Sequence, residues 1–189
     1  MRIDKDDNIT ELVALPDHPG TEKHAAPLGI DIGSDGNLYV ADNQSFYTPD
    51  AFNSRLLRVV MKDGKAEKVE VVATGFFMAN AVACRGDYVY MTESKLDLKA
   101  SPMPSGVYRF KIAELDASNP VVVKPGGEDP HLVAKLETKN MDWVGANGMG
   151  FAKDGTMYVC NFGDAALESF TFDGEGKVKE HKVVAQGQG

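Results

Sequence analysis

The sequence predicts an all-β chain that builds a β-propeller, and three observations lead to this fold class. Three segments, which start at Pro27, Ala79 and Ala146, share a pattern of an apolar strand, a polar turn and a second strand. Two more strand-like runs follow each segment, so the four-stranded unit recurs at intervals of roughly 50 to 67 residues. No segment keeps a 3.6-residue apolar period over ten or more residues, which excludes a helical repeat. Radial repetition of four-stranded sheets is typical of a β-propeller.

The turns inside the units carry the residues that hairpins require. Residues 34–36 (Ser-Asp-Gly) and 153–155 (Lys-Asp-Gly) join the first two strands of the first and third units, where glycine accepts a positive φ. The second unit has the looser Arg-Gly-Asp of residues 85–87. Glycine-containing turns at 62–65 and 173–176 join the outer strands of the first and third units, whereas residues 116–129 read as a turn-rich connection in the second.

We expect residues 1–189 to form a single, partial propeller domain. Residues 1–26 read as strand, turn and strand, the outer half of a blade, and complete blades are expected at about 27–75, 76–139 and 140–189. About three and a half blades cannot close a ring, since propellers have roughly four to eight. Open sheet edges invite association. The chain is therefore expected to be a fragment, the favoured interpretation, or to complete the ring as a homodimer.

Charge and composition argue against some classes of binding partner. The chain has a formal net charge of −8 and a pI near 5.0, without a basic stripe, so nucleic acid is not an expected partner. It has no apolar signal segment and no stretch that approaches a membrane span, so a cytoplasmic location without membrane contact is expected. Cys84 and Cys160 lie in apolar runs and are expected to be reduced, buried thiols.

The candidate site follows from the repeat. In a propeller the first strand of each blade lines the central channel, so residues at the starts of these strands converge near one mouth. The equivalent positions are Leu28, Asn80 and Asn147. Two matched asparagines can offer side-chain carbonyl oxygens to a hard cation such as Ca²⁺. Asparagine is also a common turn residue, so both interpretations stay open.

FMANAVACRGDYVYMTES and VGANGMGFAKDGTMYVCNFGD resemble successive blade entries of the SMP-30/gluconolactonase family, the six-bladed lactonases that include luciferin-regenerating-enzyme-like proteins. The resemblance covers nearly the whole chain and implies a metal-dependent hydrolase of small lactones or esters. It implies that Asn80 is a metal ligand and that Asn147 stands at the position of a metal-binding and catalytic Asp. Leu28 stands where a substrate-side Asn is expected. The implied ion is Ca²⁺, with Mg²⁺, Zn²⁺ or Mn²⁺ as alternatives.

Two of these positions depart from the family pattern. Asn147 keeps an oxygen ligand but lacks the negative charge, and a carboxamide cannot accept a proton at neutral pH. Leu28 offers no polar group, and the family's first-blade Glu has no match here. A non-catalytic NHL-like binding propeller or an inactive fragment is therefore the alternative function. His24, just before the first channel strand, and Trp143, near Asn147, are further candidates for contact with a substrate.

Two carboxylates near the same mouth have a structural interpretation. Asp42 and Glu93 follow equivalent second strands, in VADN and MTES. Because they recur with the repeat, we expect them to support the blades rather than to act on a substrate.

Overall fold

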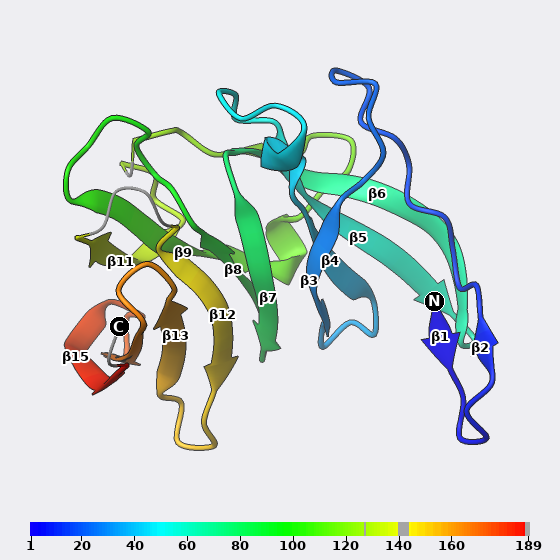
Figure 1. Ribbon diagram of the computed structural model, residues 1–189. Coiled ribbons are helices and arrows are strands. Elements are labelled where there is room, and N and C mark those ends of the chain that lie inside the picture. The colour runs from blue at the N-terminus through cyan, green and yellow to red at the C-terminus, as the bar shows by residue number, and fades with distance from the viewer. Residues whose placement is uncertain (127, 140–143, 188–189) are drawn as a thin grey trace.

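Short hairpins joined in series give the chain its architecture in the computed structural model, which describes residues 1–126, 128–139 and 144–187 (Figure 1). Among the described residues, three large sheets follow one another along the chain. Each contains four antiparallel strands in chain order, and the first gains one short parallel strand from a later segment. The first sheet contains β3 (Pro27–Ile32), β4 (Leu38–Asp42), β5 (Ser54–Lys62) and β6 (Lys65–Phe76). The second contains β7 (Ala79–Arg85), β8 (Tyr88–Glu93), β9 (Met103–Lys111) and β11 (Leu132–Thr138). The third contains β12 (Ala146–Phe151), β13 (Met157–Asn161), β14 (Ala166–Phe172) and β15 (Val178–Gln186). This arrangement confirms the all-β prediction.

The short elements lie outside this four-strand pattern. β1 (Arg2–Ile3) and β2 (Ile9–Thr10) form an exposed antiparallel hairpin, as the sequence predicts for strand, turn and strand. Whether it belongs to a preceding blade stays a prediction. The described residues also contain the 3₁₀ helices η1 (Gln44–Phe46) and η2 (Ile112–Glu114). None of the helices among the described residues is long and apolar enough to cross a membrane.

The glycine turns form where the sequence predicts them. Gly36 and Gly155 take φ values of 78° and 98° in the first hairpins of the first and third sheets, and Gly86 takes 53° in the second. A side chain in this left-handed region would be strained, so glycine is the residue that suits these turns. In the turn between β5 and β6, Asp63 and Gly64 both have positive φ, as a two-residue hairpin turn requires.

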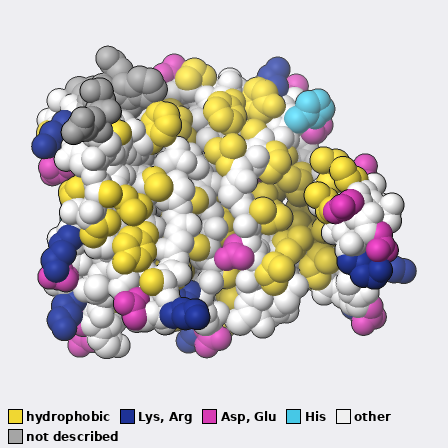
Figure 2. Space-filling view, turned by 60° about the horizontal axis from the view of Figure 1, so that its bottom comes forward, with side chains coloured by type: hydrophobic (Ala, Val, Ile, Leu, Met, Phe, Trp, Pro, Cys, Tyr) yellow, Lys and Arg dark blue, Asp and Glu magenta, His cyan; other side chains and the backbone are white. Residues whose placement is uncertain are grey.

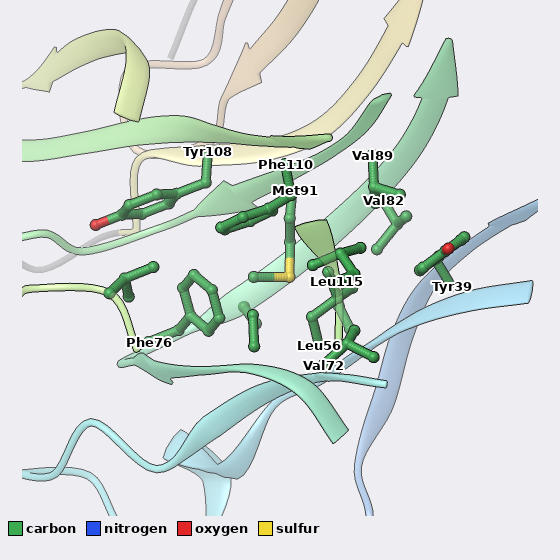
Figure 3. Packing of buried hydrophobic residues seen from close by; sticks show 14 of the residues in the cluster. Tyr39, Leu56, Val72, Phe76, Val82, Val89, Met91, Tyr108, Phe110 and Leu115 are labelled. Atoms are coloured by element: carbon green, nitrogen blue, oxygen red, sulfur yellow. The ribbon is translucent and has the colours of Figure 1, made fainter. Parts of the chain in front are cut away.

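The sheets pack face to face, and their core lies between them. Figure 3 shows the larger cluster, in which Phe76 of the first sheet meets Tyr108 and Phe110 of the second at ring-centroid distances of 5.3 and 6.1 Å. Both phenylalanines are fully buried, and burial of such a side chain contributes about 1.5–3 kcal/mol. A second cluster, with Val107, Leu136 and Phe170 among its members, fills the space between the second and third sheets. Because successive side chains along a strand point to opposite faces, the second sheet packs against the first sheet on one face and against the third on the other.

The described part of the predicted turn-rich connection, residues 116–126 and 128–129, contains a short strand. Within them, β10 (Val121–Val122) pairs in parallel with β6 and adds a fifth strand to the first sheet. Val123 is buried against Gly75, where a Cβ atom would lie 2.6 Å from the Val123 carbonyl oxygen. A two-residue strand flanked by proline and glycine has too little pattern to be recognised, because its partner lies in another unit.

The prediction that Cys160 is buried is wrong. Cys84 is half-buried, but Cys160 is exposed. Cys160 lies on the face of β13 opposite to buried Met157 and Val159, which pack toward the second sheet. No described sheet covers the face that carries Cys160, so the apolar run alone could not indicate its exposure.

Candidate functional site

The three inner strands share one irregularity at the same place. The pairing of each first strand with its second strand shifts after the first residue, which indicates a β-bulge in β3, β7 and β12. The residue that follows the first pair is Leu28, Asn80 or Asn147. Bulges re-aim side chains and are common at barrel rims and beside active sites. The three sequence candidates thus occupy structurally equivalent positions.

These bulges are joined to one another across the sheets. In Figure 1, β7 lies between β3 and β12. Gly29 packs so closely on β7 that an added Cβ atom would lie 2.3 Å from the Val82 nitrogen. On the other side, Thr92 Oγ1 accepts the Ala81 N–H at 2.8 Å and donates to the Asn147 carbonyl at 2.8 Å. The backbone around Asn80 and Asn147 is therefore held in fixed relative positions.

Asn80 and Asn147 supply the polar side chains at this position. Both are half-buried. The Asn80 amide nitrogen lies 3.5 Å from Ser94 Oγ, at the limit of a hydrogen bond, while Ser94 Oγ donates to the Ala146 carbonyl at 2.5 Å. Within the described part of the chain, the Asn147 side chain makes no hydrogen bond. Both amide oxygens are thus available to a ligand.

The other candidates have different surroundings. Leu28 is 42% exposed and lines an apolar hollow of about 290 Å³ with residues such as Val13 and Ile30, beside the N-terminal hairpin, where Figure 2 shows hydrophobic side chains gathered. His24 is exposed, and its Nδ1 lies 2.8 Å from Asp17 Oδ1. Trp143 lies outside the described residues. His24 is therefore paired with Asp17, and Leu28 borders an apolar hollow.

A second set of matched, buried polar residues lies beside the starts of the inner strands. Asp42, Glu93 and Asn161 end the second strand of the three sheets and pair with the first residue of the inner strand. Asp42 accepts the Ala26 N–H at 2.8 Å and is paired with Arg55; both side chains are almost fully buried. The carboxylate is fully engaged, which supports the structural interpretation of this residue.

Glu93 has the same role without a cation. Its carboxylate accepts the N–H groups of Phe77, Met78 and Lys95 at 2.7, 2.8 and 3.1 Å. Burial raises its pKa to about 7, although these backbone hydrogen bonds act in the opposite direction. The carboxylate holds the segment that leads into β7, next to Asn80, so it positions the candidate ligand.

Asn161, the third member of this set, is not predicted from the sequence. The Asn161 amide accepts a hydrogen bond from Thr138 Oγ1 at 2.9 Å and donates to the Glu137 carbonyl and Glu168 at 3.0 and 2.9 Å. Glu168 in turn lies 2.5 Å from His181 Nε2. The repeat aligns VCN with VAD and MTE, and this alignment could have identified Asn161. The neutral Asn161 differs in charge from Asp42 and Glu93, which hides the equivalence.

The residues around the bulges fit a metal ion only in part. In the described residues, no group of three or more His, Cys, Asp and Glu side chains is placed to hold a metal. Asn80 and Asn147 would supply two neutral oxygens, whereas Ca²⁺ takes six to eight oxygen ligands, usually with carboxylates among them. Further ligands would have to come from backbone carbonyls, water or blades beyond the three described sheets.

Comparison with known proteins establishes the fold. No family model and no curated protein matches the sequence. The structure is similar to that of the PQQ-bound form of aldose sugar dehydrogenase from Streptomyces coelicolor, with a TM-score of 0.55 and 15% identity over 86% of this chain and 50% of that one. The chain is a β-propeller. Its four-stranded sheets and this propeller-type neighbour confirm the predicted fold class, and the chain spans about half the length of the neighbour.

Proposed function

We propose that this chain belongs to a metal-dependent hydrolase of small lactones or esters, similar to the SMP-30/gluconolactonase family. The observation that supports this proposal is the placement of Asn80 and Asn147 in matching β-bulges of adjacent inner strands. Their amide oxygens would be two ligands of a divalent cation, for which Ca²⁺ is the first choice. The bound cation would polarise the carbonyl group of the substrate.

The residues of this chain would position the ion rather than transfer protons. Glu93 fixes the segment before Asn80, and Thr92 fixes the backbone of Asn147. Asn147 cannot act as a base, because a carboxamide accepts no proton at neutral pH. A carboxylate on a further blade would have to activate the water molecule.

Calcium titration of the purified chain by isothermal calorimetry tests the site. We expect binding that Asn80→Ala and Asn147→Ala each weaken at least about tenfold, and that Asn147→Asp strengthens, since the added charge attracts the ion. Asn119→Ala, in an exposed turn, is the matched control. Equal calcium affinity in all four variants would contradict the proposal. Hydrolysis of a sugar lactone is then assayed, with aldose oxidation in the presence of PQQ in parallel because of the structural neighbour.

A non-catalytic binding propeller is the second candidate. It is favoured by the apolar Leu28 at the third matching position and by the absence of a metal-binding carboxylate cluster from the described residues. A chain that binds no Ca²⁺, even as Asn147→Asp, and hydrolyses no lactone would support this function.

We also propose that a second copy of the chain completes the ring. At one end of the row of sheets, β3 leaves Leu28, Ile30 and Ile32 between 42 and 61% exposed; at the other, Val183 and Val184 of β15 are 57 and 47% exposed. Such faces are buried between neighbouring sheets elsewhere in this molecule. Native mass spectrometry should give twice 20.4 kDa. A monomer that keeps its strand content in circular dichroism would contradict the dimer.

A further inference from the structure

A groove of about 540 Å³ lies between the second and third sheets, beside the turns that follow β7, β12 and β14. We call it the inter-sheet groove; its walls contain Arg85, Tyr88, Tyr90, Arg109 and Phe151. The Arg85 guanidinium lies 5.3 Å from the centre of the Phe151 ring, and that of Arg109 lies 5.1 Å from the Tyr88 ring. The volume is in the range of small-molecule sites.

The repeat supplies an internal comparison for this groove, because the first and second sheets meet in the same way. Tyr39 pairs with Arg58 in the first sheet as Tyr90 pairs with Arg109 in the second. These residues therefore occupy equivalent places on the faces that the two sheets turn toward their following neighbours. The two interfaces can be compared residue by residue.

The first interface is filled and its charge is balanced. Arg58 donates to Glu70 at 2.9 and 2.6 Å and to the Leu115 carbonyl at 3.0 Å. Leu115, which follows η2, is buried in the core between these sheets. Asp31 accepts the Cys84 N–H at 2.7 Å. The long connection after β9 thus closes the space that Arg58 borders.

The second interface lacks both carboxylates and gains a cation. Ala83 stands opposite Tyr90 where Asp31 stands opposite Tyr39. Glu70 has no acidic counterpart: the backbone N–H of Arg109 donates to the carbonyl of His131, and the His131 ring contacts Asp129 and Phe110 instead. Arg85, the last residue of β7, stands two residues after Ala83, as Gly33 stands two residues after Asp31 in the first sheet. Arg85 therefore takes the place of a glycine. At the equivalent positions, the first interface has one arginine and two carboxylates, whereas the second has two arginines and no carboxylate.

Both arginines of the inter-sheet groove keep donors that the protein does not use. Each donates to one backbone carbonyl of the third sheet, Arg85 to Ala152 at 3.0 Å and Arg109 to Gly176 at 3.2 Å, and Arg109 also hydrogen-bonds the Tyr90 hydroxyl. Among the described residues, no carboxylate lies within 4.0 Å of either guanidinium. A guanidinium has five N–H donors in a planar fork that matches a carboxylate.

Three acidic residues lie at the rim, Asp154, Asp173 and Glu175, and each has a partner in its own turn; Glu175 is paired with Lys177 at 2.8 Å, and Asp154 also feels the charge of Arg85. Asp154 accepts the Thr156 N–H, and Asp173 accepts the Lys177 N–H, both at 2.9 Å. Their negative charges would repel a dianion more strongly than a monoanion. The turn after β14 is short, so no segment like the one after β9 closes the groove.

We propose that the inter-sheet groove binds a small organic carboxylate, which accepts hydrogen bonds from Arg85 and Arg109 while its body packs against the aromatic rings. This site is separate from the inner-strand asparagines and needs no metal. Charge-assisted bonds to the two guanidinium groups supply recognition, and the rings supply an apolar wall.

Titration of the ¹⁵N-labelled full chain with sodium benzoate, in EDTA and followed by NMR, tests the proposal. We expect shifts in residues of the groove, and at least about tenfold weaker binding of the neutral analogue benzamide. Arg85→Gln, Arg109→Gln and Ala83→Asp, which restores the carboxylate of the first interface, should each lower the benzoate affinity about tenfold or more. Arg2→Gln, at an exposed arginine of β1, should bind as the wild type does.

Three results would overturn the proposal: equal binding of benzoate and benzamide, tighter binding of phenyl phosphate than of benzoate, or no binding to the wild type. In the last case, a fall in melting temperature in Arg85→Gln and Arg109→Gln would show that these side chains only clamp the two sheets together. If a glutamine variant does not fold, the lysine variants decide. They keep the charge but lose the fork, so they should weaken benzoate binding in a folded chain.

Discussion

The pH dependence of stability should reveal the buried carboxylate of Glu93. The side chain is 2% exposed, and burial raises its pKa to about 7 from an ordinary value of 4.5. The folded state therefore holds its proton to higher pH than the unfolded state, so stability falls as pH rises between about 4.5 and 7. A difference of about 2.5 between the pKa values corresponds to about 3 kcal/mol, at 1.36 kcal/mol per unit.

Comparison with Glu93→Gln isolates this contribution. Urea denaturation at pH values from 4.5 to 8 gives the free energy of unfolding of both proteins. We expect the wild type to lose about 3 kcal/mol relative to the variant as pH rises to 7, with no further change above it. Burial lowers the pKa of His18 in both proteins, so its contribution cancels in the difference. The glutamine NH2 group would face one of the backbone N–H donors, but this cost does not change with pH and so does not affect the comparison of the two pH profiles.

A constant difference between wild type and Glu93→Gln across this range would refute the reasoning. A difference of the opposite sign would show that the three backbone N–H donors outweigh burial and hold the carboxylate ionised. Glu11→Gln is the control, since Glu11 is exposed and its substitution should leave the wild-type curve unchanged.

Three further predictions test the packing of the repeat. Arg55→Ala should cost about 3–5 kcal/mol in chemical denaturation, because it leaves a buried carboxylate without its cation; a loss below 1 kcal/mol would contradict this. Gly29→Ala should lower stability by about 1–3 kcal/mol, since its Cβ would overlap the backbone of β7, whereas Gly150→Ala, with open space, should change it little. At pH 8 Cys160 should react with a thiol reagent much faster than Cys84, whose pKa burial raises to about 12; equal rates by mass spectrometry would argue against this burial.

The sequence predicted those features of the fold that depend on neighbouring residues. Turns with glycine at positive φ and alternating apolar residues identify the hairpins, and their recurrence identifies the sheets. The strand at Val121–Val122 escaped prediction, because it pairs with β6 of another sheet. The exposure of Cys160 escaped for a similar reason, since it depends on which face of the third sheet is covered.

The candidate site was predictable in its position but not in its contacts. Repeat alignment placed Asn80 and Asn147 at equivalent positions, and the shared bulges agree with that alignment. Their ligand roles stay a prediction. The bond from Thr92 to Asn147 joins two sheets, and no pattern within one unit could indicate it.

The differences among the repeats carry more functional information than the repeat itself. Asp42, Glu93 and Asn161 differ in charge, yet each hydrogen-bonds a neighbouring segment. Asp42 and Glu93 bind the entries to β3 and β7, and Asn161 binds the end of β11, so their position serves the fold. At the position of Arg58 and Arg109 the residue is the same in two sheets, but its partners differ. Arg58 and Arg109 are identical, but only Arg58 has a carboxylate partner among the described residues. An arginine that is ion-paired in one interface and has no ion pair in the next keeps hydrogen-bond donors for a ligand. The inter-sheet groove is therefore a stronger binding candidate than its sequence alone would indicate.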